Sequence, residues 1–210
     1  MNTARPYLLL LSLSLFAPLV AACSSLLAPV PDRTSYYILT PIAASATSPS
    51  TGSELTIGLG EIHLPAYLDR REMVTRIDAN RLKIADNDLW AEPLSAAVRS
   101  VLNENLAQLL GPVRIVNYPW YSSTHVDYAV TLNATNFQCD TGRQCRVDAQ
   151  WSISNQAGQM VCQGHSAITL TADSDSASAQ AAALSQALGQ MSRQIADSVS
   201  QASQAHAAAH

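Results

Sequence analysis

The chain has 210 residues, with 12 basic and 16 acidic side chains and a net charge of −4 when its histidines are neutral. Hydrophobic residues make up 48% of the sequence and charged residues 13%, which is about half the charged share of an average globular protein. This is enough apolar material for one medium-sized domain. The acidic balance, with Lys83 as the single lysine, excludes the broad basic surface that nucleic-acid binding needs. We therefore expect no nucleic-acid partner.

The first 22 residues have the pattern of an export signal. Arg5 is their only charged residue, and the apolar stretch 7–20 is too short to span a bilayer. Ala21 and Ala22 precede Cys23, whose sulfur can carry a diacylglyceryl group, and this arrangement resembles the lipobox of bacterial lipoproteins. The sequence thus predicts a signal peptide over residues 1–22 and lipidation at Cys23. The alternative is a plain secretory signal followed by an incidental cysteine.

Lipidation at Cys23 would determine where the mature chain resides. The remaining 188 residues carry 11 basic and 16 acidic side chains. Three acyl chains, as the lipoprotein resemblance implies, contribute about 0.8 kcal/mol per buried CH₂ group, so the anchor would be effectively permanent. Ser24 follows the cysteine, and the absence of Asp there favours export to the outer membrane in enterobacterial lipoproteins. We expect a chain anchored by lipid to the periplasmic face of the outer membrane, with residues 23–33 as its lipidated N-terminus and tether.

The first half of the domain reads as short strands joined by turns. Alternating and β-branched apolar residues predict strands over residues 35–40, 55–64, 73–77 and 81–84. Residues 41–53, dense in Ala, Ser, Thr and Pro, are expected to form a loop within the domain. Residues 65–70 are expected to form a turn or a short helix.

A change of period marks the first helix. Apolar residues recur every three or four positions over residues 93–110, Pro93 suits the first helical turn, and Gly111-Pro112 ends it. A short strand over 113–116 follows. Strands over 126–139, 145–153 and 160–171 then form an antiparallel meander.

The last regular element is a helix over residues 176–200, in which apolar residues again recur at spacings of three and four within an Ala-, Ser- and Gln-rich segment. The element order predicts an α+β fold: a single mixed/antiparallel sheet with two main helices packed on one side. The domain is expected to span residues 34–200, with residues 201–210 as a tail.

Three cysteines remain after lipidation. Cys139 and Cys145 bracket a hairpin turn, and in-register strands would place them opposite each other for a disulfide, whereas Cys162 would be left unpaired. The alternatives are two free thiols or a bridge that involves Cys162. Five residues between Cys139 and Cys145 do not fit a zinc knuckle, so we expect no metal site.

The sequence offers no convincing catalytic centre. It contains no Gly-x-Ser-x-Gly motif to expose a serine nucleophile. His125 and Asp127 would share one face of a strand, and we interpret them as a surface pair. Phosphate-binding loops are also lacking. We expect no catalytic residues and no cofactor.

A cluster of apolar, aromatic and charged residues is the best candidate for a partner interface, because aromatic residues and Arg concentrate binding energy. It comprises Leu64, Pro65, Tyr67, Leu68, Asp69 and Arg70, together with Trp90 and Glu92. The alternative is structural: Leu64 and Leu68 would belong to the core, Asp69 would pair with an Arg to brace the turn, and Glu92 would complement the dipole of the following helix.

Three motifs in this order carry a resemblance to a known family. They are Tyr-Tyr-Ile-Leu at 36–39, Leu-Pro-Ala-Tyr-Leu-Asp-Arg at 64–70, and Trp-Ala-Glu-Pro-Leu at 90–94. Together they resemble the ABC-type transport auxiliary lipoprotein family, the PqiC-like proteins of Gram-negative envelopes. The chain departs from the family pattern in its three late cysteines and in Asp88-Leu89 before Trp90.

The resemblance implies an auxiliary, non-enzymatic subunit of an MCE-type lipid transport system that supports membrane integrity and contacts an MCE-domain protein. The sequence leaves open whether copies of the chain form a homo-oligomer. Two other functions remain as alternatives: a lipid-anchored periplasmic hydrolase, and an assembly or pilot lipoprotein of an outer-membrane complex.

Overall fold

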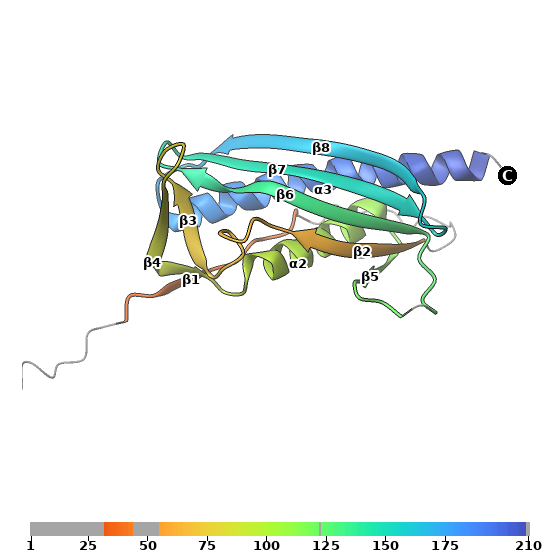
Figure 1. Ribbon diagram of the computed structural model, residues 1–210, viewed down its shortest axis with the longest axis horizontal. Helices are drawn as coiled ribbons and strands as arrows, with labels where there is room; N and C mark the ends of the chain where they lie inside the picture. Colours follow the sequence, from red (N-terminus) through yellow and green to blue (C-terminus); the bar gives the residue numbers. More distant parts are fainter. Residues whose placement is uncertain (1–31, 44–54, 122, 209–210) are drawn as a thin grey trace, which may run out of the picture. The chain divides into compact units, whose positions relative to one another are not determined.

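The computed structural model describes residues 32–43, 55–121 and 123–208 (Figure 1). Residues 34–210 form one compact unit, and only residues 32 and 33 of the unit that precedes it are described. The predicted signal peptide, Cys23 and most of the predicted tether lie outside the described residues.

Within the described residues, the chain forms one eight-stranded mixed sheet and two helices. The elements in chain order are β1 (Ser35–Tyr37), β2 (Thr56–His63), β3 (Glu72–Arg76), β4 (Leu82–Trp90), α2 (Leu94–Leu110), β5 (Arg114–Asn117), β6 (Tyr128–Asp140), β7 (Gln144–Asn155), β8 (Met160–Thr171) and α3 (Ala177–Ala208). The predicted α+β class with a single mixed sheet is confirmed.

Strand β6 is the centre of the sheet. One of its edges pairs antiparallel with β7 from Tyr128 to Cys139, and β7 pairs in the same way with β8, which gives the predicted meander. The other edge of β6 is shared by two parallel strands: β2 pairs with its first half and β3 with its end, at Cys139 and Asp140. Beyond them lie β5, next to β2, and β4 and β1, next to β3. The sheet therefore joins segments that are far apart in the sequence.

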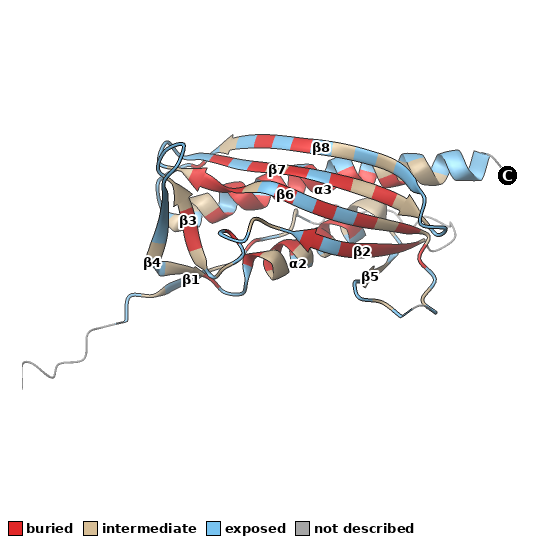
Figure 2. Ribbon diagram, viewed as in Figure 1, coloured by how far each residue is buried: buried red, intermediate tan, exposed pale blue. Residues whose placement is uncertain are grey.

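Both helices pack on one face of this sheet, behind the strands in Figure 1. Alternate residues of β6 and β7 are buried under the helices or exposed on the opposite face, which gives the striped pattern in Figure 2. The predicted apolar stripe of the C-terminal helix, formed by Leu184, Leu188, Met191, Ile195 and Val199, is buried. The alternating apolar residues of the strands and the apolar stripes of the helices therefore form one common core.

A buried amide fastens the two helices to the segment that follows β1. Asn105 on α2 is fully buried; its Nδ2 donates to the Ser192 hydroxyl on α3 at 2.9 Å, and its Oδ1 accepts from the backbone N–H of Ile42 at 2.8 Å. A second bond joins the same segment to α3, because the backbone N–H of Thr40 donates to the Ser185 hydroxyl at 3.0 Å. Three separate parts of the chain therefore meet at Asn105.

A close approach between β7 and β8 requires a glycine. The Trp151 indole lies over Gly164, where an added Cβ would lie 2.1 Å from the ring. The indole N–H donates to Ser166 Oγ at 3.0 Å, which satisfies this buried donor. The glycine thus leaves room for a large side chain between the sheet and α3.

Two elements extend further than the sequence predicts. β4 continues to Trp90 instead of ending near residue 84, and α3 continues to Ala208 instead of ending near residue 200. In β4 the polar residues 86–88 hide the strand signal, but the strand pairs with β3 and, at Asp88 to Trp90, with β1. In α3 the apolar stripe ends before the helix does.

Candidate functional site

The turn at residues 65–70 is held by its own backbone. The N–H groups of Leu68 and Asp69 both donate to the carbonyl of Pro65, at 2.8 and 3.2 Å. This geometry buries Leu68, which is 2% exposed, and leaves Tyr67 36% exposed. Leu64 and Pro65 are half-buried. The turn therefore presents Tyr67 outward and uses Leu68 as a core residue.

Asp69 connects this turn to the start of α2. Its Oδ1 accepts from the backbone N–H of Ser95 at 3.2 Å, whereas Pro93 at the N-cap position provides no side-chain bond. The first N–H groups of a helix lack partners within the helix, and a negative charge there also complements the helix dipole. Asp69 thus caps α2 from a distant part of the sequence, instead of pairing with an Arg.

The second part of the predicted interface divides between core and surface. Trp90 is 3% exposed and lies with Leu68 and Leu94 around the same small space in the core. Glu92 is exposed. The Arg71 guanidinium reaches the carbonyls of Trp90 and Ala91 at 3.4 and 3.2 Å, which ties the two parts of the predicted interface together.

Arg70 forms an ion pair with Glu72 in which Nε and Oε2 are 2.9 Å apart. The hydrogen bond from Arg70 is the main reason why the pKa of Glu72 lies below its ordinary value. A carboxyl group whose pKa is lower in the folded than in the unfolded state stabilises the fold at pH values above its unfolded-state pKa. This stabilisation is lost as the pH falls through the folded-state pKa. Of the predicted interface residues, Tyr67, Asp69 and Glu92 are exposed and Arg70 is partly so.

His125 and Asp127 do lie together, with His125 Nε2 2.9 Å from Asp127 Oδ1. Asp127 also fastens the start of β2, because its Oδ2 accepts from the backbone N–H of Thr56 at 2.8 Å. The other ring nitrogen of His125 lies 3.3 Å from the side-chain nitrogen of Gln156. The Asp127 carboxylate therefore stabilises the start of β2, and both ring nitrogens of His125 lie within hydrogen-bonding distance of another side chain.

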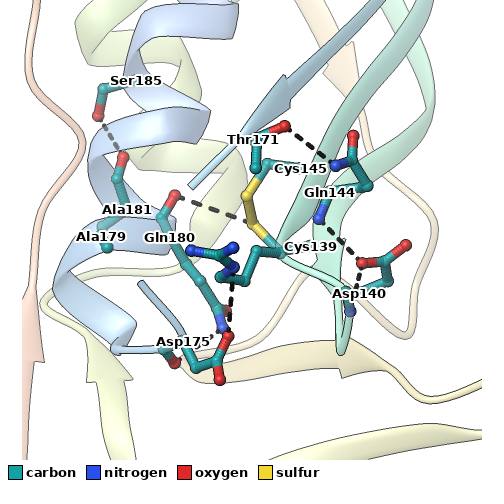
Figure 3. Close-up of a disulfide and its surroundings, with 12 residues drawn as sticks. Cys139, Asp140, Gln144, Cys145, Thr171, Asp175, Ala179, Gln180, Ala181 and Ser185 are labelled. Carbon is teal, nitrogen blue, oxygen red and sulfur yellow. Dashed lines mark hydrogen bonds and ion pairs between the residues drawn. A yellow bond between two sulfur atoms is a disulfide. The ribbon is translucent and has the colours of Figure 1, made fainter. Parts of the chain in front are cut away.

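A disulfide joins Cys139 and Cys145 across the β6–β7 hairpin (Figure 3). Asp140 organises the turn between them by accepting from the backbone N–H groups of Gly142 and Gln144, at 2.8 and 2.9 Å. The Cys139 sulfur lies 3.9 Å from the carbonyl oxygen of Gln180 on α3, as Figure 3 shows. Cys162 is a half-buried free cysteine on β8.

A broad groove lies on the sheet face opposite the helices, at a place where the sequence predicted no site. This groove has a volume of about 960 Å³. Outward-facing residues of four strands form its floor, including Glu61 and His63 on β2, Thr131 on β6 and Ser152 on β7. The Thr131 and Ser152 hydroxyls are hydrogen-bonded at 2.8 Å.

Two aromatic residues from the loop after β5 form one wall of the groove. The rings of Tyr118 and Trp120 meet edge to face, with centroids 5.7 Å apart and planes at 89°. Trp120 covers Gly58, where an added Cβ would lie 2.9 Å from its ring. The Tyr-Pro-Trp-Tyr sequence at 118–121 was the available signal, but only the fold places it beside β6, β7 and β8.

In the described part of the chain, no group of three or more His, Cys, Asp or Glu side chains is arranged to hold a metal ion. None of the helices described is long and apolar enough to cross a membrane.

The sequence profile of one family, described as the ABC-type transport auxiliary lipoprotein component, matches residues 37–196. The chain belongs to this family. The resemblance drawn from the motifs at 36–39, 64–70 and 90–94 is therefore confirmed. This auxiliary lipoprotein family is a transport family and not a known family of enzymes.

Two relatives are similar in sequence to this auxiliary lipoprotein over part of their length. The intermembrane transport lipoproteins PqiC of Escherichia coli (strain K12) and Shigella flexneri are each 24% identical to it over 127 residues. The matched region covers 60% of this chain and 66% of each relative, so it spans just under two-thirds of their length.

Solved structures show the same fold. A crystal structure of an uncharacterized protein has a TM-score of 0.67 and 22% identity, covering 79% of this auxiliary lipoprotein and 98% of the other chain. A crystal structure of a Xanthomonas campestris protein has a TM-score of 0.66 and 14% identity, covering 83% and 99%. At this level of identity these structures support the fold alone.

Proposed function

We propose that this auxiliary lipoprotein is a non-enzymatic subunit of an MCE-type lipid transport system, anchored through Cys23 to the outer membrane and acting through protein contacts that support membrane integrity. The observation that carries the proposal is the family match over residues 37–196. The name of the relatives, intermembrane transport lipoprotein, agrees with it.

The proposed partner surface consists of exposed and partly exposed residues around the N-terminus of α2. Tyr67, Arg70 and Glu92 lie on segments that are joined by the Arg71 contacts and by the Asp69 cap, so their backbones are held in place before any partner binds. Such preorganisation lowers the entropic cost of association. Leu68 and Trp90 support this surface from within the core and are not available to a partner.

The proposal that the chain is not an enzyme rests on the transport family and on the arrangement at His125. A hydrolase needs a nucleophile within hydrogen-bond reach of its base. Here the neighbours of the two His125 nitrogens are Asp127 and Gln156, and Asp127 is also bound to the Thr56 backbone.

Purification after crosslinking tests the proposed partner. The lipoprotein, extracted from crosslinked membranes, should carry an MCE-domain protein with it, and Tyr67→Ala with Arg70→Ala should reduce the yield of that complex at least several-fold. Tyr121→Ala is the matched control, because Tyr121 is 84% exposed and lies in a different loop. An outer-membrane pore protein in place of the MCE-domain protein would favour the pilot function, and esterase turnover that survives repurification would favour the hydrolase.

Membrane fractionation tests the proposed location. Cys23→Ser should release the chain from the membrane fraction, whereas Cys162→Ser should leave it there. Ser24→Asp should move the lipoprotein to the inner-membrane fraction, and Ser25→Asp serves as its control. Unchanged outer-membrane recovery of the Cys23→Ser chain would contradict lipid anchoring.

A further inference from the structure

The groove on the open face of the sheet has an unusual charge. Among the described residues that line it there is no Lys or Arg, and the one acidic side chain is Glu61. Its two histidines are each bonded to a carboxylate: His63 to Glu61, with Nε2 and Oε2 2.9 Å apart, and His165 to Asp148. A ligand with an uncompensated negative charge would therefore meet no fixed cation in this groove, whereas a positive group would meet a carboxylate.

The aromatic wall also favours a positive group. Ring faces carry negative electrostatic potential and attract organic cations, most strongly for Trp. Tyr118 is 48% exposed, Trp120 lies against Gly58, and the two nearly perpendicular rings form an aromatic corner in the lining of the groove. Glu61 lines the same groove. An aromatic corner combined with a carboxylate is the chemistry that recognises an ammonium group.

The rest of the lining suits a larger amphiphile. Met160, at the start of β8, is 62% exposed, and Ala129 adds apolar surface to the floor. The remaining floor offers hydroxyl and amide groups, such as those of Thr131, Asn133 and Gln150. A volume of about 960 Å³ is near the upper end of the range for small-molecule sites, roughly 300–1,000 Å³.

We propose that this groove binds the ammonium headgroup of a zwitterionic phospholipid, with Tyr118, Trp120 and Glu61 as the recognition residues. The choice of a lipid as the source of the ammonium group rests on the proposed transport function. The preference for ammonium over an anionic headgroup rests on the side chains of the groove alone. An experiment can therefore refute the proposed transport function without refuting the preference for an ammonium group, and the reverse.

The test uses the mature chain from residue 24 onward, exported without its lipid, because residues 34–210 form one compact unit. The probes are short-chain dihexanoyl phosphatidylethanolamine, phosphatidylcholine and phosphatidylglycerol below their micellar concentrations, with binding measured by calorimetry. The two ammonium lipids should bind at least about tenfold more tightly than the glycerol lipid. Equal binding of all three, or no binding, would overturn the proposal.

Variants assign the recognition to the named residues. Glu61→Gln and Trp120→Leu should each weaken binding of the ammonium lipids roughly two- to fivefold, as expected for cation–π and charge contacts at a partly exposed site, and Trp120→Phe should retain most of it. Tyr121→Ala is the control outside the groove. Circular dichroism checks that each variant is folded. Because the Glu61 side chain is exposed, Glu61→Gln tests the charge contact without disturbing the packing of Trp120.

Two further outcomes are decisive. Free ethanolamine or choline that binds as tightly as the lipids would overturn the lipid as the source. If the lipids bind as expected but no MCE-domain protein co-purifies with the chain, the groove assignment is supported and the proposed partner is not.

Discussion

Replacing Asn105 with Ala should destabilise the protein by about 2–4 kcal/mol. The substitution removes two hydrogen bonds, each with a net contribution of about 1 kcal/mol, and leaves the Ile42 N–H without its acceptor, which costs about 1–3 kcal/mol more when the group is buried. Because Ile42 is only half-buried, this last cost is at most about 2 kcal/mol, and the total is about 2–4 kcal/mol. For a domain of this size, the melting temperature should fall by roughly 4–16 °C.

Urea unfolding of the mature chain, followed by circular dichroism, measures this change. The matched control is Asn103→Ala on the same helix, because the Asn103 amide makes only a long 3.4 Å bond to Asn117 and should change the free energy of unfolding by less than about 0.5 kcal/mol. Ser192→Ala removes one partner of Asn105, and the double variant should cost less than the sum of the two single ones by about 0.5–3 kcal/mol.

Asn105→Ala and Asn103→Ala with equal and small effects would refute the reasoning, because the buried amide would then have no special role. Strict additivity of Asn105→Ala and Ser192→Ala would refute the direct bond between α2 and α3.

Three further changes test other contacts of the fold. Gly164→Ala should destabilise by about 1–3 kcal/mol in urea unfolding, since its Cβ would lie 2.1 Å from the indole above it; a neutral effect would contradict this packing. Asp69→Ala should cost about 0.5–2 kcal/mol through loss of the α2 cap, whereas Glu92→Ala at the same end of the helix should cost less than about 0.5 kcal/mol, and equal effects would exclude the cap. Replacing both Cys139 and Cys145 with Ser should lower the free energy of unfolding by roughly 2 kcal/mol. Diagonal electrophoresis of the unsubstituted exported chain should show a mobility change on reduction, and no change would contradict the disulfide.

Local patterns in the sequence predicted the elements that depend on local physics. The helical period over residues 94–110 and the alternation in β6, β7 and β8 determine which side of each element is apolar, and adjacent antiparallel strands need only short turns to pair. The result was a correct set of helices and a correct meander.

The parallel pairings were beyond the reach of such patterns. β2 and β3 both add to the same edge of β6, although more than 50 residues separate each of them from their pairing partners on β6. Nothing in a strand's own residues records which distant strand it will meet, and β4 shows the same limit because its polar end is a strand only by virtue of its neighbours.

The candidate sites divide in the same way. The motif at residues 64–70 was visible as a continuous run, but its division into the buried Leu68, the capping Asp69 and the exposed Tyr67 depends on contacts with α2. The open-face groove was missed because its lining comes from four strands and a loop, each of which contributes only a few alternate residues.

The fastening of residues 40–42 to both helices has a mechanical consequence for a chain anchored at Cys23, as we propose. A force between membrane and body would act on the N-terminal end of β1, where the three-residue pairing of β1 with β4 would resist it. If that short strand peeled away, the pull would next reach the bonds from Thr40 to Ser185 and from Ile42 to Asn105. The body would then be held through its helical layer, so the sheet and its open groove could stay intact under load.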